Sequence, residues 1–208
     1  MGLTLAIASE ARVGVVIAAW SGRLSRMYHW DVERDVFTPG QFVKARASVL
    51  AISPNGKYVV YYAEAFSKVD QAYVAISHVP YFTAQVFQSQ FHLGSRAARF
   101  AEDGSLDLFV MTYSFPWVRN RESVQDRIDK GCPFEIRLHG RRDWVLNRMA
   151  PKNADTRCTE DQPRNRTVYS GGLDLVERQP RDKEPRVLKS FIKEEFQEVA
   201  PPEWATRW

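Results

Sequence analysis

Ser53-Pro54-Asn55-Gly56-Lys57-Tyr58 is the stretch that decides the fold of this 208-residue chain. It separates two apolar runs, Val49–Ile52 and Tyr58–Ala63. Asn-Gly between apolar runs is a strong β-hairpin signal, because both residues tolerate positive φ. A turn of the same type, Glu102-Asp103-Gly104-Ser105-Leu106, follows 48 residues later. A recurrence at about 40–50 residues indicates a repeat architecture, so repeated β-units are expected.

Other apolar runs keep nearly the same spacing. Tyr73–Ile76 matches Tyr28–Val32 at an offset of 45 residues. Tyr58–Tyr62 is apolar at consecutive positions, which is typical of a strand buried on both faces. Ala97–Phe100 and Leu106–Tyr113 flank the second Asx-Gly turn. The predicted unit is therefore strand, Asx-Gly turn, strand, loop, strand, short turn, strand.

Two later stretches fit this series less closely. One is predicted to supply the third and fourth strands of the unit that begins at Ala97, and it comprises Phe134–Leu138 and Trp144–Leu146. The other is predicted to be a further first hairpin, with Thr167–Tyr169 and Leu173–Val176 on either side of Gly171-Gly172.

Two insertions interrupt the repeats, and a tail follows them. The insertion 114–131 is predicted to have a helical core, with Asn120 as its cap and Gly131 at its end. The insertion 150–166 is polar and is predicted to be a long surface loop. From Arg186 onward, an apolar stripe predicts a C-terminal helix. A strand over Val187–Ile192 is the alternative. The stripe comprises Leu188, Phe191, Ile192, Phe196 and Val199. We therefore expect a β-repeat domain over 1–180, and a C-terminal helix and tail over 181–208.

The repeated units resemble the blades of β-propellers, particularly the TolB-like and WD-repeat types. In those folds a Ser-Pro-Asp-Gly-like turn joins the first two strands of a blade, as Ser53-Pro54-Asn55-Gly56 would here, with a degenerate copy at Ala101-Glu102-Asp103-Gly104. Trp30-Asp31 sits where WD-repeat blades place their Trp-Asp pair, at the end of the third strand. The second unit has Ile76-Ser77 there, so the resemblance is to blade architecture and not to one propeller family. It implies an all-β fold of four-stranded antiparallel blades.

The number of predicted strands corresponds to about three blades. Closed propellers typically have ~4–8 blades. Either the ring is small and irregular, or the repeats form an open stack. An open stack would expose sheet edges and apolar faces, which proteins normally cover. We therefore expect a protein partner or self-association to complete the stack.

Composition narrows the class of protein. The chain is 44% hydrophobic and 26% charged, as ordinary globular domains are, and its net charge of +4 is mild. The N-terminal apolar patches fit neither a signal peptide nor a membrane span, and the two cysteines lack metal-ligand spacing, so a cytoplasmic protein is expected. The four histidines are not spaced as metal ligands, and neither a metal nor a cofactor is predicted.

The sequence contains neither GxSxG, a Walker loop nor GxGxxG, so no catalytic residue is assigned. Aromatic and arginine side chains dominate binding hot spots, and they cluster at Trp117, Arg119 and Arg121, with Arg141 and Arg142 in a predicted hairpin tip. The predicted function is thus a non-catalytic protein–protein interaction or scaffold module.

Two alternatives stay open. One is a glycosidase-like hydrolase with acidic residues at the propeller axis, which requires at least two of these carboxylates to converge: Asp31, Glu33, Asp35, Asp107 and Asp174. The other is a nucleic-acid binder that uses the mildly basic surface.

Overall fold

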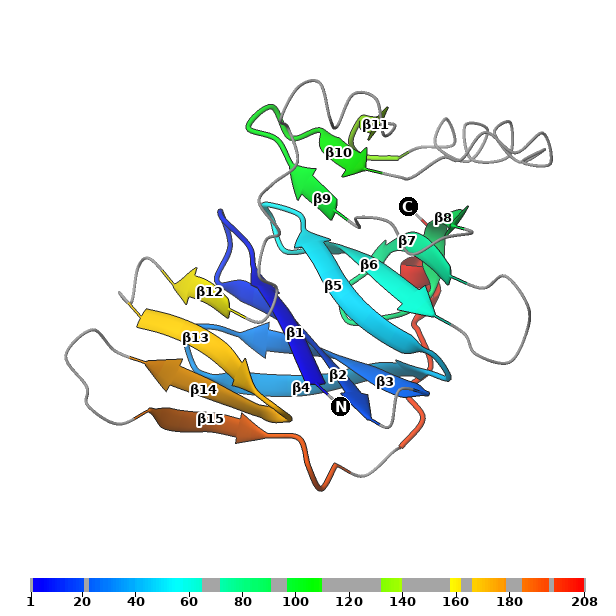
Figure 1. The fold of residues 1–208 in the computed structure, drawn as a ribbon. Coiled ribbons are helices and arrows are strands. Elements are labelled where there is room, and N and C mark those ends of the chain that lie inside the picture. The colour runs from blue at the N-terminus through cyan, green and yellow to red at the C-terminus, as the bar shows by residue number, and fades with distance from the viewer. Residues whose placement is uncertain are drawn as a thin grey trace.

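The structure is a computed structural model, and it describes residues 2–20, 23–64, 72–90, 97–109, 132–139, 158–161, 166–178, 185–194 and 197–207. The described residues form an all-β fold of four sheets (Figure 1). Sheet A contains β1 (Gly2–Ile7), β2 (Val13–Trp20), β3 (Leu24–Asp31) and β4 (Val36–Val43). Sheet B contains β5 (Arg46–Ile52), β6 (Tyr58–Glu64), β7 (Ala72–His78) and β8 (Ala84–Gln90).

Sheet C contains β9 (Ala97–Phe100), β10 (Leu106–Phe109) and β11 (Ile136–His139). Sheet D contains β12 (Cys158–Asp161), β13 (Arg166–Gly171), β14 (Asp174–Arg178) and β15 (Arg186–Ser190). The 3-10 helix η2 (Glu203–Thr206) is the one helical element among the described residues. None of the helical structure described has the length and hydropathy that a membrane span requires.

The recurring Asx-Gly turn has the same geometry in sheets B and C. Gly56 has φ 74° and Gly104 has φ 80°, in the left-handed region that favours glycine. The Gly56 amide donates to the Ser53 carbonyl, and the Gly104 amide donates to the Ala101 carbonyl, both at 2.9 Å. The predicted hairpins are therefore confirmed, and each joins the first two strands of its sheet.

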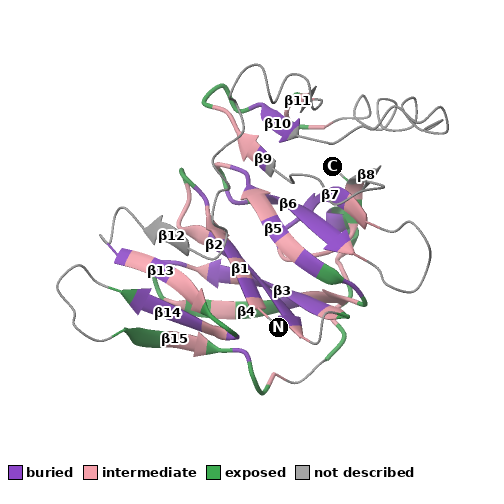
Figure 2. Ribbon diagram, viewed as in Figure 1, coloured by how far each residue is buried: buried purple, intermediate pink, exposed green. Residues whose placement is uncertain are grey.

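The sheets pack face to face in the order D, A, B, C. In β2, Val15 and Ile17 belong to the apolar cluster shared with sheet B, whereas Val16 and Ala18 belong to the cluster shared with sheet D. Successive side chains of a strand point to opposite faces, so both faces of sheet A are covered. Sheet B is buried in the same way, between sheets A and C. Figure 2 shows β6 almost wholly buried and β15, at the edge of sheet D, mostly exposed.

Both-face burial explains the apolar pattern of the sequence. Tyr58, Val60 and Tyr62 pack toward sheet C, while Val59 and Tyr61 pack toward sheet A. The interpretation of Tyr58–Tyr62 as a strand covered on both faces is confirmed. Trp30-Asp31 ends β3, the third strand of its sheet, as expected.

Three expectations about strand arrangement were wrong. The described strands form four sheets, and not the equivalent of three blades. The strand expected at Phe134–Leu138 is β11, and it pairs parallel to β10 rather than antiparallel. The segments on either side of Gly171-Gly172 form β13 and β14, the second and third strands of sheet D, because β12 adds in front of them. Trp144–Leu146 lies outside the described residues.

The predicted C-terminal helix was also wrong, and the alternative strand is present. Arg186–Ser190 forms β15, because the free edge of β14 offers backbone hydrogen bonds to it. Phe191 then turns into the core with no exposed surface, whereas Ile192 is 59% exposed. The polar segment 150–166 contains β12, which pairs with β13, so it is not one continuous loop. The predicted helix within 114–131 lies outside the described residues.

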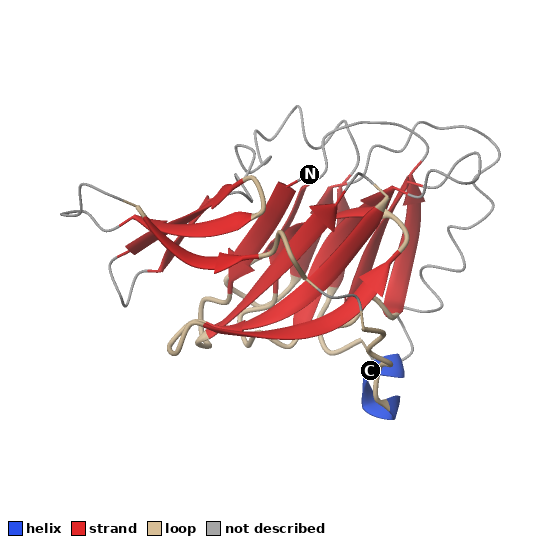
Figure 3. Ribbon diagram, turned by 90° about the horizontal axis from the view of Figure 1, so that it is seen from below, coloured by secondary structure: helices blue, strands red, loops and turns tan. Residues whose placement is uncertain are grey.

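The segment after β15 crosses from sheet D to sheet B. The Trp20 indole donates to the Phe191 carbonyl at 3.0 Å, and the Arg26 guanidinium donates to the Gln197 carbonyl at 2.9 Å. The His78 ring then contacts the Arg207 carbonyl at 3.0 Å. Figure 3 shows η2 at one end of the sheets, beside the C-terminus. Side chains of sheets A and B thus hold the last described residues of the chain.

Candidate functional site: the charged face of sheet C

Sheet C has one apolar face and one charged face. Ala98, Leu106 and Leu108 pack on sheet B. Arg99 lies opposite Asp107 across β9 and β10, and Asp107 lies beside Arg137 across β10 and β11. Because side chains alternate along a strand, these charged residues share the face turned away from sheet B.

Asp107 is the centre of this face. Its carboxylate accepts a hydrogen bond from Arg99 Nε at 3.0 Å and one from His139 Nε2 at 2.8 Å. The side chain is only 7% exposed. Burial opposes its ionisation, but the hydrogen bonds from His139 and Arg99 outweigh burial, and the pKa of Asp107 lies below its ordinary value. An ionised carboxylate can only accept, so Nε2 of His139 carries the proton.

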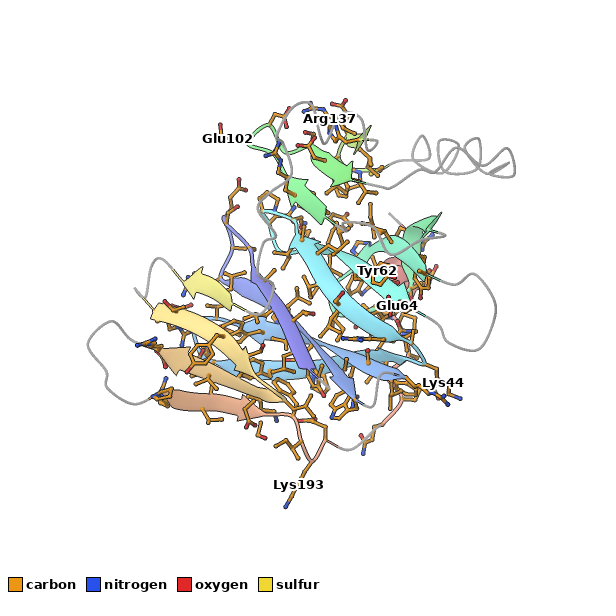
Figure 4. All side chains as sticks on the ribbon, in the orientation of Figure 1. Lys44, Tyr62, Glu64, Glu102, Arg137 and Lys193 are labelled. Atoms are coloured by element: carbon orange, nitrogen blue, oxygen red, sulfur yellow. The ribbon has the colours of Figure 1, made fainter. Side chains whose placement is uncertain are left out.

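A second cluster of charged side chains, which is exposed, lies beside the Asp107 cluster. Arg137 donates to Asp103 at 2.7 Å and to Glu135 at 3.1 Å. The Ser105 hydroxyl and amide, together with Arg137, hold the pKa of Asp103 well below its usual range. Exposed ion pairs of this kind contribute little to stability, so this group mainly fixes the orientation of Arg137. Figure 4 places Glu102 and Arg137 at the sheet C end of the molecule and Lys193 at the opposite end.

The parallel pairing of β10 and β11 brings two distant segments of the chain together. Phe109 and His139 are register partners at the ends of these strands. Residues 110–131 follow Phe109, and residues 140–157 follow His139, so both segments leave sheet C from the same edge. The five predicted binding residues fall in these segments and lie outside the described residues: Trp117, Arg119, Arg121, Arg141 and Arg142.

A buried ion network joins sheets A and D, and nothing in the sequence interpretation anticipated it. The Arg166 guanidinium donates to both carboxylate oxygens of Asp35, at 2.8 and 2.9 Å, and its side chain is 1% exposed. Glu177, which is also buried, lies 3.8 Å from Arg166 and accepts from Arg186. Arg166 also lies over the Trp30 ring, at 5.6 Å from its centroid. The network is a structural link between the sheets.

The five carboxylates considered for hydrolysis lie on three different sheets. Asp31 caps the β3–β4 turn by accepting from the backbone amides of Glu33 and Arg34. Asp35 ends the same turn and binds Arg166. Asp107 lies on sheet C and Asp174 on sheet D. Asp31, Asp35 and Asp107 thus pair with backbone amides, a cation and a histidine ring.

Histidines and cysteines were the other candidates for chemistry. Within the described ranges, no three side chains of His, Cys, Asp or Glu gather as metal ligands would. The pKa of His29 is lowered, because burial outweighs the nearby Asp31 carboxylate, which acts in the opposite direction. Cys132 is a free thiol, and burial raises its pKa, so its thiolate is disfavoured.

The Asp107 cluster predicts a specific pH dependence. Asp107→Asn should lower the free energy of unfolding by about 1–3 kcal/mol at pH 7, because charge-assisted hydrogen bonds to Arg99 and His139 weaken. The folded-state pKa lies below the unfolded value of about 3.9, so the contribution is complete above that pH and is lost as the pH falls below it.

Urea unfolding of both proteins between pH 7 and pH 2.5 measures this difference. The two stabilities should converge below about pH 4. Glu102→Gln, an exposed change in the neighbouring turn, is the control and should follow the wild-type throughout. A difference that stays constant down to pH 2.5 would show that the Asp107 charge is not involved.

Comparison of the chain with models of protein families, with curated proteins and with solved structures gave no match.

Proposed function

We propose that this protein is a non-catalytic protein–protein interaction or scaffold module. In this proposal the packed sheets are a rigid body, and the segments that leave sheet C carry the recognition residues. Rigid scaffolds that present variable segments are a common arrangement for binding. This site supports the proposal, whereas the fold does not, because a fold does not imply an activity.

The parallel pairing of β10 and β11 carries the proposal. It supports a shared location for the two candidate segments, since they begin next to each other at Phe109 and His139. Arg141 and Arg142 are within about 11 Å of His139 along the chain, because an extended residue spans at most ~3.6 Å. Arg99 and Arg137 add guanidinium groups to the same face, where they also pair with Asp107 and Asp103. An acidic or aromatic surface of a partner protein suits this chemistry.

We further propose that the sheets are propeller-like blades. The four sheets pack face to face, and their first strands gather, with β1 against both β5 and β12, and β5 against β9. Inner strands that meet around an axis are typical of propellers. The described apolar clusters join D to A, A to B and B to C. Either a partner or further sheets would complete such a ring between C and D.

Affinity capture tests the proposed function. Trp117→Ala combined with Arg121→Ala should reduce recovery of a specific partner at least tenfold, because hot-spot truncations typically cost more than ~1.4 kcal/mol. Arg34→Ala is the matched control, because this exposed arginine lies on the β3–β4 turn of sheet A, far along the chain from sheet C. If the double variant retains every partner that the wild-type binds, the interaction proposal fails.

Light scattering of the purified chain tests whether the partner is another copy. A dimer or larger species that dissociates on Arg141→Ala with Arg142→Ala would make self-association the function of these segments. A monomer leaves a different protein as the partner.

A further inference from the structure

The end of the described chain lies in a site formed by sheet B. Ala205 has no exposed surface, although residues on both sides of it are exposed. Gln85 Nε2 donates to the Ala205 carbonyl at 2.9 Å. His78 Nε2 lies 3.0 Å from the Arg207 carbonyl and must carry the proton, because a carbonyl only accepts. Two backbone carbonyls of the tail are thus held by side chains of β7 and β8.

Aromatic side chains complete the site. The Trp204 ring packs edge-on against His78, at a centroid distance of 5.3 Å, and against Tyr81, at 5.7 Å. His78 is 8% exposed and also packs on Tyr58 at 4.6 Å. Tyr58 belongs to the core between sheets B and C, so His78 packs on a side chain that this core holds in place.

The segment that leads into this site is partly exposed after the Gln197 carbonyl, which accepts from Arg26 at 2.9 Å. Gln197, Glu198 and Ala200 are exposed, and Pro201-Pro202 precede η2. Exposed segments with few buried apolar contacts open at a small fraction of the global unfolding free energy. The tail can therefore leave the site while the sheets stay folded.

The contacts in this site combine general and sequence-dependent features of a peptide. They include two backbone carbonyls, a small residue with no exposed surface and an aromatic ring before it. We infer that the His78–Tyr81–Gln85 site of sheet B is a peptide-binding site, which the chain's own tail occupies and thereby blocks. Its ligand is an exposed segment of another protein in which prolines lead to a Trp followed by Ala. This inference is independent of the segments that leave sheet C.

The tail sets a threshold that such a partner must exceed. A tethered segment has an effective concentration on the order of 1 mM. If the tail occupies the site about nine-tenths of the time, the apparent affinity of an external peptide falls about tenfold. Displacing the tail should therefore raise the apparent affinity of the external peptide about tenfold.

The experiment uses the full chain and a labelled peptide of residues 200–207, Ala-Pro-Pro-Glu-Trp-Ala-Thr-Arg. Ala205→Glu places a charge where the tail has no exposed surface, so the tail undocks. Fluorescence anisotropy should show peptide binding to this variant at least about tenfold tighter than to the wild-type. Thr206→Glu adds the same charge at the adjacent exposed residue, and it should bind the peptide as the wild-type does.

Two further binding measurements identify the site and the source of the ligand. Gln85→Ala in the Ala205→Glu chain should abolish the gain, and a peptide that itself carries Ala205→Glu should not bind. If a folded Ala205→Glu chain fails to bind the peptide at about 1 mM, the site is not a peptide site. If the wild-type is a dimer that Ala205→Glu converts to a monomer, tails exchange between copies, and the proposal of a separate partner is wrong.

Hydrogen exchange on the wild-type chain keeps the inference testable if Ala205→Glu does not fold. The Ala205 amide, which donates to the Pro202 carbonyl, should exchange through local opening, far faster than the amides of β6. Exchange of both at the same rate would make the tail an integral part of the fold and would overturn the inference.

Discussion

Arg166→Met should lower the free energy of unfolding by about 3–5 kcal/mol, which is the usual cost of removing one partner of a buried ion pair. Arg166 is 1% exposed and binds Asp35 through two parallel hydrogen bonds. Its removal leaves the Asp35 and Glu177 carboxylates near one another, with the exposed Arg186 lying 3.9 Å from Asp35 and 2.6 Å from Glu177. It also removes the cation from the face of Trp30.

Denaturant titration of Arg166→Met and of a matched surface variant measures this effect. Arg34→Met removes an arginine that is 78% exposed and lies 3.7 Å from Asp31, so its loss should cost about 0–1 kcal/mol. Arg166→Lys keeps the charge but not the paired hydrogen bonds, so it should fall between the two. A loss below about 1 kcal/mol for Arg166→Met would contradict a role for the network in joining sheets A and D.

Gly56→Ala should cost about 2–5 kcal/mol, from two separate causes. At φ 74° an alanine adopts a left-handed conformation that costs about 1–2 kcal/mol. A Cβ at this position would also lie 2.7 Å from the Cβ of Val13 in sheet A, and overpacking of this kind costs about 1–3 kcal/mol. The Pro54 carbonyl, in the same turn, accepts from the Glu10 amide at 3.0 Å, so the turn cannot easily move away.

Gly104→Ala separates the two causes. Its φ of 80° imposes the same conformational cost, but no atom of the described residues lies within 4 Å of a Cβ placed there. Urea unfolding should therefore place Gly104→Ala about 1–2 kcal/mol below the wild-type and Gly56→Ala lower still. Equal losses at the two glycines would show that contact with Val13 costs nothing.

Local signals in the sequence were enough to predict most strands. Asn55-Gly56 and Asp103-Gly104 marked hairpins that the structure confirms, because both signals depend on backbone conformation a few residues apart. The apolar run Tyr58–Tyr62 indicated burial on both faces for the same reason. Arg99 and Asp107 were also predictable as a pair, since the second hairpin fixes their register.

Long-range pairing was not predictable in this way. His139 reaches Asp107 only because β11 joins β10 in parallel, and a long segment separates the two strands in sequence. The apolar stripe after Arg186 fits a helix as well as a strand, and the edge of β14 decides between them. Arg166 and Glu177 share the inward face of the hairpin β13–β14, but only the position of sheet A shows which carboxylate they meet. For these residues, tertiary contacts decide the outcome.

The packing of sheet D on sheet A also affects how the chain is made. The D-facing side of sheet A, with Val16, Tyr28 and Trp30, leaves the ribosome well before the sheet D residues that cover it, such as Val168 and Phe191. At about 5–20 residues per second, this apolar face waits on the order of 10–30 s for its cover. During synthesis the protein therefore exposes an apolar surface of the kind that aggregates, and rapid translation of residues 32–168 should favour its yield.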